Sequence, residues 1–467
     1  MKKIEPEQLF DEIRLLMERN DAATLRRRLD EADAADLAEI VEMLDDEEQQ
    51  MFMAALDAEE AGEVLSMVDE ATRGELLEDM TEQALTGAVA TMPPDDAADL
   101  LAELPDEQSE EVLERLPDEQ AADVATLLQY EEDTAGGLMT PEFISVAEDA
   151  TVSHVVAELR KMELDAEEPF FIYVVDESQR LRGLVPLRKL IAVPPDTRVS
   201  AIMTAELVSV SVDDDQEEVA NVIRRHDLPA VPVLSSAGRL VGRITHDDVA
   251  DVIVEEADED MLRMAGTDAA ELERASSLRA ARVRMTWLLP CLVGTMLTGL
   301  VMAAFKAQID VHEFMLLVLF VPMIAAMGGN SGVQASTIII RGLATQELAG
   351  QSVALALRRE AGIAAAVGVG CGIVAGVVSF AVVWGLEALG QAQSDLSPMA
   401  VGVAVSAAML LAIHVAVALG TFLPFVFRRI GIDPAIASGP LITTSNDIIS
   451  VAIYLTIGMV TVSMFGH

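Results

Sequence analysis

Five long apolar runs fill the C-terminal part of the sequence, and they constrain the fold more than any other feature. They extend approximately over Trp287–Ile309, Phe314–Ile340, Ala361–Leu386, Met399–Phe427 and Pro434–Met464. A helix needs about 20 apolar residues to cross the roughly 30 Å of hydrocarbon in a bilayer, and each run meets that length. The sequence therefore predicts an α-helical membrane domain with five spans over residues 287–467.

The part of the chain before this domain has a very different charge. The chain has a formal net charge of −47, yet the part after Thr286 holds only six of its 31 Lys and Arg and eight of its 78 Asp and Glu. So acidic a half would repel nucleic acid and anionic lipid headgroups, which excludes nucleic acid as a partner and favours cations. A solvated acidic surface, as in a salt-adapted organism, would explain the charge equally well.

The basic residues predict how the chain lies in the membrane. Five arginines lie between the second and third runs or between the fourth and fifth: Arg341, Arg358, Arg359, Arg428 and Arg429. Basic loops stay on the cytoplasmic side, and the N-terminus lacks the apolar stretch of a secretory signal. We expect a multi-pass protein of the inner (cell) membrane with residues 1–286 in the cytosol and the C-terminus outside.

The N-terminal region, residues 1–130, has the apolar spacing of helices throughout. Pro93, Pro105 and Pro117 recur at a constant interval in similar contexts. Because proline fits only the first turn of a helix, each repeat predicts one short helix that begins just after its proline. We expect an acidic, all-α helical solenoid over residues 1–130, with an ordinary helical bundle as the alternative.

Residues 131–255 follow a different pattern, which occurs twice. Phe171–Val175 and Leu181–Val185 read as strand, turn, strand before a helix, and Val231–Leu234 and Leu240–Thr245 repeat this order. The repeat predicts a tandem α/β module, and the sequence resembles a pair of CBS domains. A polar, helix-prone stretch over residues 256–286 then predicts a long connecting helix.

The second CBS copy resembles a nucleotide-binding sequence. Its segment Gly242–Asp248 is similar to the one that contacts ribose and phosphate in that family, whereas the first copy has Pro186 in place of Thr245 and Lys189 in place of Asp248. The resemblance leaves nucleotide binding open at the second CBS domain only.

Two of the apolar runs carry polar residues. Asp447 is a carboxylate at membrane depth, and the runs hold no basic residue except Lys306. Such a carboxylate normally faces a water-filled path or a partner, which favours a cation; a protonated Asp447 hydrogen-bonded between helices is the alternative. Neutral oxygens in the same two runs are pore-lining candidates: Asn330, Gln334, Thr443, Thr444 and Asn446. Mg²⁺ keeps several waters and suits one or two carboxylates with neutral oxygens.

Together with Glu131–Met139 and Glu259–Gly266, the two polar runs resemble the MgtE family of magnesium channels, and the resemblance covers essentially the whole chain. It implies a helical N-domain, two CBS domains, a connecting "plug" helix and five membrane helices per subunit. It also implies a homodimer that passes Mg²⁺ along the dimer axis, with Asp447 matching the pore aspartate.

Three acidic clusters predict regulation by cytosolic Mg²⁺. They are Asp95, Asp96 and Asp99; Asp247, Asp248 and Asp251; and Glu255, Glu256 and Glu259. Like charges four positions apart on a helix repel one another unless a divalent ion lies between them. The resemblance assigns this regulatory role to matching positions: Asp95, Asp99, Asp248, Asp251, Glu256 and Glu259. The sequence departs from the family at Val254, where a third glutamate is expected. We therefore expect Mg²⁺ to be both the transported and the regulatory ion, with closure at high cytosolic Mg²⁺.

Other functions fit the sequence less well. A carrier for cobalt, nickel or manganese would use similar oxygen sites, so it is the principal alternative. A membrane-anchored sensor would need only one or two helices, and a pore with a carboxylate in mid-membrane would oppose anions. The sequence contains no nucleophile and base pair and no phosphate-binding loop, so we expect no enzyme activity.

Overall fold

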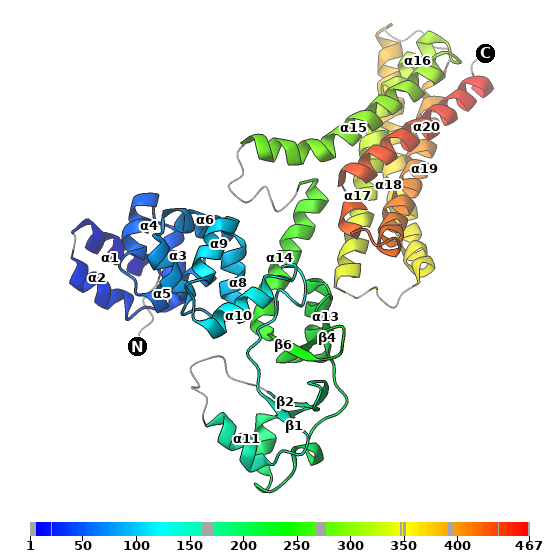
Figure 1. The fold of residues 1–467 in the computed structure, drawn as a ribbon. Coiled ribbons are helices and arrows are strands. Elements are labelled where there is room, and N and C mark those ends of the chain that lie inside the picture. Colours follow the sequence, from blue (N-terminus) through cyan, green and yellow to red (C-terminus); the bar gives the residue numbers. More distant parts are fainter. Residues whose placement is uncertain are drawn as a thin grey trace. The chain divides into compact units, whose positions relative to one another are not determined.

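The computed structural model describes residues 6–19, 21–160, 171–267, 277–345, 348, 352–390, 396–437 and 439–465. Its contacts divide the chain into two compact units, Met1–Glu255 and Glu256–His467. Each unit has apolar cores of its own. Figure 1 shows the helices and strands of both.

Ten short helices form the N-terminal part of the first unit. They are α1 (Pro6–Glu18), α2 (Ala22–Leu29), α3 (Ala34–Glu42), α4 (Asp46–Met53), α5 (Ala58–Met67), α6 (Glu70–Asp79), α7 (Glu82–Val89), α8 (Pro94–Ala102), α9 (Asp106–Leu113) and α10 (Asp118–Leu127). The last three begin directly after Pro93, Pro105 and Pro117, which confirms the helix starts predicted from these prolines.

The period of the prolines extends much further back in the chain. The N-cap residues of α2 to α10 all follow one another at the same interval: Asp21, Asp33, Asp45, Asp57, Asp69, Thr81, Pro93, Pro105 and Pro117. The first six accept a hydrogen bond from a backbone N–H of the first turn. These residues start a helix in two ways. Aspartate and threonine accept a hydrogen bond from a backbone N–H that has no partner within the helix, whereas proline, with its fixed φ, favours the helical turn that follows it.

Two three-stranded sheets follow in the same unit, in agreement with the predicted tandem α/β module. In the first, β1 (Ser145–Ala147) pairs parallel with β2 (Phe171–Val175), which pairs antiparallel with β3 (Leu181–Pro186). In the second, β4 (Val210–Ser211), β5 (Ala230–Leu234) and β6 (Leu240–Thr245) repeat this topology. The accompanying helices are α11 (Val152–Leu159), α12 (Leu187–Ala192), the 3₁₀ turn η1 (Val199–Ala201) and α13 (Gln216–His226).

The segment of residues 131–140 is fixed to the second sheet module. Backbone N–H groups of Ala135 and Gly136 donate to Asp214 and Val212, at 2.7 and 2.9 Å. Gly137 has to lack a side chain, because a Cβ there would lie 2.6 Å from the carbonyl oxygens of both Glu131 and Glu132. The motif Glu131–Met139 therefore contains a tight turn.

The predicted long connecting helix is interrupted. α14 (His246–Ala265) ends where Gly266 adopts φ +82°, and the N–H of Thr267 donates to the carbonyl of Leu262 at 3.0 Å, as in a glycine-terminated helix. The next helix begins at Ser277. The rest of the predicted connecting helix, residues 268–276, lies outside the described residues.

In its described residues the second unit has seven helical segments beyond α14: α15 (Ser277–Lys306), α16 (Val311–Val318), α17 (Val321–Ala344), α18 (Val353–Ala388), α19 (Pro398–Arg429), the 3₁₀ turn η3 (Pro434–Ala437) and α20 (Gly439–Phe465). By length and composition they provide five candidate membrane spans in the described residues, with α16 and α17 together making the second. This confirms the five predicted spans. The α16–α17 break precedes Pro322, whose missing N–H would leave a carbonyl of a continuous helix unpaired.

Candidate functional site

The acidic residues of α8 and α14 lie together in the first unit. Burial, then the negative charges of Asp248 and Asp251, raise the pKa of Asp96 to about 6, although Arg73 partly opposes them. Asp95 lies beside Asp96 and is itself buried. The structure therefore brings the predicted regulatory residues Asp248 and Asp251 close to Asp96, a member of the same predicted acidic cluster as Asp95 and Asp99.

Asp248 has a structural role as well. Its Oδ2 accepts hydrogen bonds from the backbone N–H of Thr245 at 3.0 Å and from the Thr245 hydroxyl at 2.5 Å, at the start of α14. Burial nevertheless raises the pKa of Asp248, and the Thr245 bonds only partly oppose this. A carboxylate that folding holds in place at this cost is well placed to gain from a cation.

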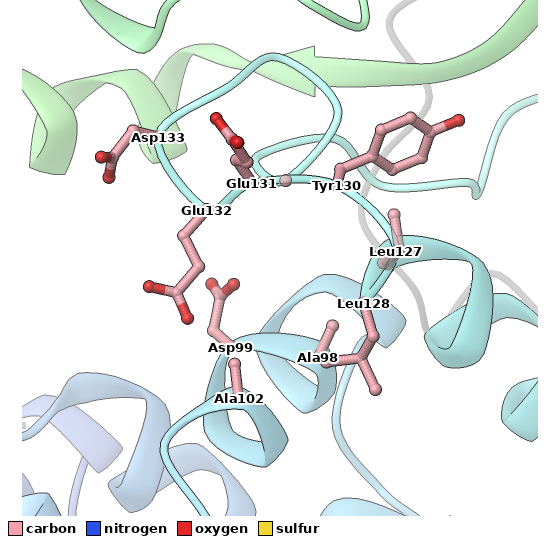
Figure 2. A pocket seen from close by; sticks show the side chains of 10 residues that line it. Ala98, Asp99, Ala102, Leu127, Leu128, Tyr130, Glu131, Glu132 and Asp133 are labelled. Carbon is pink, nitrogen blue, oxygen red and sulfur yellow. The ribbon is translucent and has the colours of Figure 1, made fainter.

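Asp99, one turn after Asp95 on α8, faces a pocket of about 470 Å³. Figure 2 shows its carboxylate and that of Glu132 pointing toward one another across this pocket. Burial, then the charges of Asp96, Glu132 and Glu103, raise the pKa of Asp99 to about 7. Of the ten residues that line the pocket, four are acidic and none is basic: Asp99, Glu131, Glu132 and Asp133 are the acidic ones.

No preformed metal cage is present in the part of the chain that the structure describes, because no three His, Cys, Asp or Glu side chains lie close enough to hold one ion directly. The carboxylates nevertheless lie close enough to raise one another's pKa values. This arrangement suits an ion that keeps its water and binds through it, as Mg²⁺ does.

A third acidic group lies in the second unit, near the end of α14. The pKa of Asp260 is raised to about 6 by burial, then by the charges of Asp433 and Glu256. Arg263 forms ion pairs with Glu259 and, at 2.6 Å, with Asp433. The structure thus places the predicted residues Glu256 and Glu259 beside Asp260 and Asp433, which the prediction missed because Asp433 is distant in sequence.

The end of α14 also packs against the start of α20. A Cβ at Gly266 would lie 2.7 Å from Pro440, and the carbonyl oxygen of Met264 lies close to Gly439. Both glycines have positive φ, at +82° and +30°. Only glycine therefore permits this close joint between α14 and the helix that carries Asp447.

Asp447 is the one charged residue of α20. It is partly exposed, and among the described residues it makes no hydrogen bond or ion pair. Thr443 and Thr444, one turn earlier, lie against Gly329 of α17 and Gly294 of α15. Helix α20 therefore packs tightly on two sides, while the carboxylate oxygens of Asp447 stay free to bind a ligand.

The remaining pore-lining candidates divide into two groups. Asn330 and Gln334 lie on an exposed face of α17, where they are open to a partner or to water. Asn446 is fully buried against the same helix. Spacing along the sequence placed all three in polar runs, but it could not show which face of each helix packs inward.

The residues considered for nucleotide binding also differ between the two CBS copies. In the first copy, Lys189 donates to the carbonyl oxygen of Ile202 at 2.9 Å. In the second, Thr245 and Asp248 bond to each other. Neither geometry tests nucleotide binding, which stays a prediction for the second copy.

Comparison with protein families finds three matches in order along the chain. Residues 32–133 match the MgtE intracellular N domain, residues 135–196 and 199–255 match the CBS domain, and residues 321–457 match MgtE, described as a divalent cation transporter. The matches cover both units.

Individual relatives agree with these families. The magnesium transporter MgtE of Thermus thermophilus is 38% identical over 71% of this chain and 70% of that protein. The magnesium transporter MgtE of Bacillus subtilis is 33% identical over the same shares. Among solved structures, the chain is similar to a crystal structure of the cytosolic domain of the Mg²⁺ channel MgtE in complex with ATP, with 38% identity, a TM-score of 0.49, and coverage of 51% of this chain and 98% of that one.

Proposed function

The chain belongs to the MgtE family of divalent cation transporters, and from this premise we propose that it carries Mg²⁺ across the cell membrane into the cytosol. The observation that carries the proposal is Asp447: a partly exposed carboxylate, alone among neutral residues on a membrane-length helix, with no partner among the described residues. A hydrated divalent cation supplies the partner that a carboxylate at this depth requires.

The path requires a second copy of the chain. Asn330 and Gln334 are polar yet exposed on a helix of membrane length, which is costly against lipid. A homodimer whose subunits turn these faces toward a shared axis would remove that cost and add their oxygens to the path of the ion. Residues 1–286 then lie in the cytosol and the C-terminus outside.

Cytosolic Mg²⁺ closes this path. Asp96 and Asp99 are crowded by other carboxylates that raise their pKa values to about 6 and about 7, so Mg²⁺ between these groups would stabilise the arrangement in which they lie together. α14 begins among the acidic residues of the first unit and ends against α20. Ion binding along α14 can therefore bias the helix that carries Asp447. A nucleotide at Thr245 and Asp248 would act on the same end of α14.

The principal alternative is transport of another divalent ion, such as cobalt, nickel or manganese. The described family, divalent cation transporter, is broader than Mg²⁺, and carboxylate with neutral oxygens admits these ions too. The two functions share an architecture and differ only in selectivity.

Ion flux into liposomes containing the purified full-length protein tests the proposal. Mg²⁺ entry should greatly exceed that of protein-free liposomes, and cobalt or manganese at equal concentration should compete only weakly. Flux of cobalt or manganese without flux of Mg²⁺ would establish the alternative, and no flux of any divalent ion would refute both.

A further inference from the structure

We infer that Asn446 is a positioning residue, which sets the direction of the Asp447 carboxylate by locking α20 against Gly328 of α17. The inference rests on the proposed function of Asp447. It concerns a side chain that the sequence placed among the pore-lining candidates and that the structure buries completely.

One face of α20 forms a continuous seam with α17 and α16. The seam residues recur at every fourth position: Ile442, Asn446, Ser450, Tyr454 and Gly458, all of them buried. Ile442 lies against Gly332, Asn446 and Ser450 lie against Gly328, and Gly458 lies against Leu317. Tyr454 donates its hydroxyl to the carbonyl of Leu317 at 2.8 Å. The seam fixes how far α20 is rotated about its own axis.

Asn446 and Ser450 occupy the space beside Gly328, where a side chain would otherwise lie. A Cβ at Gly328 would lie 2.5 Å from the Nδ2 of Asn446 and 2.8 Å from the hydroxyl of Ser450. The Oδ1 of Asn446 accepts a hydrogen bond from Ser450 at 3.0 Å. The amide therefore fills the space that the absent side chain of residue 328 leaves, and neither helix can turn without disturbing it.

This position costs stability, which argues against packing as its whole purpose. The Nδ2 of Asn446 is buried and has no acceptor among the described residues, and an unmade hydrogen bond in a dry interior is unfavourable. An apolar side chain of the same size would fill the space without that cost. Departures of this kind are expected where a residue serves function.

Asp447 follows Asn446 directly, so its direction is set by the same rotation. Successive residues are about 100° apart around a helix, and a side chain lies about 5–6 Å from the axis. A rotation of about 30° would therefore move the carboxylate by roughly 3 Å, enough to misplace a group that must meet a hydrated ion. The neighbouring Thr443 and Thr444 would leave Gly329 and Gly294 at the same time.

The test measures Mg²⁺ flux in liposomes as a function of external Mg²⁺. Asn446→Ala should raise the half-saturating concentration by about tenfold, with maximal flux within about threefold of the wild type, because misplacement by an ångström or more weakens such interactions strongly. The double variant Gly328→Ala, Asn446→Ala refills the space with a methyl group and should return the half-saturating concentration toward the wild-type value. Asn446→Leu, which fills the space without the amide, should raise the half-saturating concentration less than Asn446→Ala does.

Tyr454→Phe is the matched control, since it removes a hydrogen bond from the same seam two turns away. It should lower thermal stability without changing the half-saturating concentration. An unchanged half-saturating concentration in Asn446→Ala, or the same change in Tyr454→Phe, would overturn the inference. A change in Asn446→Leu as large as in Asn446→Ala would also overturn it, since the amide would then act on the ion itself. Wild-type flux in Asp447→Asn would instead refute the proposed role of Asp447.

Discussion

The first unit and the last membrane helix use the same side chain in opposite ways. Around α8 and α14 the carboxylates crowd together, and their charges raise one another's pKa values. On α20 one carboxylate, Asp447, stands alone among neutral residues. Under the proposed function, the crowded carboxylates bind Mg²⁺ as its cytosolic concentration rises and so act as a sensor. Under the same proposal, the isolated carboxylate among neutral oxygens holds a hydrated cation weakly enough to release it along a conduction path.

The largest effect is expected when the isolated carboxylate is removed. Asp447→Ala should reduce Mg²⁺ flux by about 100-fold or more, because no other charge on α20 can replace it. Flux into liposomes at matched protein content measures this. Glu387→Gln, an exposed carboxylate near the end of α18, is the control and should conduct normally. An equal loss of Mg²⁺ flux in Asp447→Ala and Glu387→Gln would mean that Asp447 has no special role in conduction.

Removing charge from the crowded group should change regulation and leave conduction intact. In the variant Asp96→Asn, Asp99→Asn, the cytosolic Mg²⁺ concentration that halves flux should rise by about tenfold, the effect of roughly 1.4 kcal/mol of coupling. Glu107→Gln, Glu111→Gln removes the same charge from exposed positions of α9 and should have little effect. If both double variants raise the Mg²⁺ concentration that halves flux by the same factor, closure depends only on the total charge of the domain.

A pH titration should distinguish the crowded carboxylates from ordinary surface ones. The pKa values of Asp96 and Asp99, about 6 and about 7, exceed the ordinary value of 3.8. Between about pH 4 and 7 the folded state therefore binds more protons than the unfolded chain, so stability falls as pH rises through this window. Without Mg²⁺, residues 1–255 of the full-length protein should resist protease to a higher temperature at pH 5 than at pH 8. Millimolar Mg²⁺ should protect mainly at pH 8.

The same double variant provides the control for this titration. With Asp96 and Asp99 replaced by asparagine, the pH dependence should become smaller and the protection by Mg²⁺ weaker. Protease resistance that increases from pH 5 to pH 8 in the wild type would contradict the raised pKa values.

The smallest effect is expected at the joint between α14 and the start of α20. Arg263→Gln removes the ion pairs to Glu259 and Asp433, which are partly exposed, so thermal unfolding should change by no more than about 1 kcal/mol. Residual flux at high cytosolic Mg²⁺ should nevertheless increase if this joint transmits closure. Arg428→Gln serves as the control at another basic helix end. No increase in residual flux would remove Arg263 from the closing mechanism.

The regular elements of both units could be predicted from the sequence because each depends on local patterns. The strands around residues 171–185 and 231–245 and the five membrane spans follow from period and length. The repeat of the N-terminal helices was recognised only at its prolines, because the earlier N-caps are aspartate and threonine, which also occur throughout an acidic domain. The end of α14 was missed because the sequence around Gly266 remains helix-prone on both sides.

The candidate sites were harder to predict because they depend on contacts distant in sequence. Glu132 faces Asp99 across the pocket, although the two residues lie far apart in the sequence. Asp433 approaches Asp260 only because glycines let α14 and α20 meet. Asn446 and Asn330 have similar sequence contexts, yet one is buried and the other exposed, since a helical pattern rich in small residues does not show which face packs.

The central claim, that the crowded carboxylates sense the ion which the isolated carboxylate conducts, is tested most directly by varying Mg²⁺ on one side of the membrane. Full-length protein is oriented in liposomes with residues 1–255 facing a bath of controlled Mg²⁺, and flux is followed with a constant gradient of a conducted tracer. The account predicts that flux falls nearly to zero as Mg²⁺ in that bath rises through the millimolar range, and that the variant Asp96→Asn, Asp99→Asn requires more. Flux that stays constant or increases over that range would contradict it.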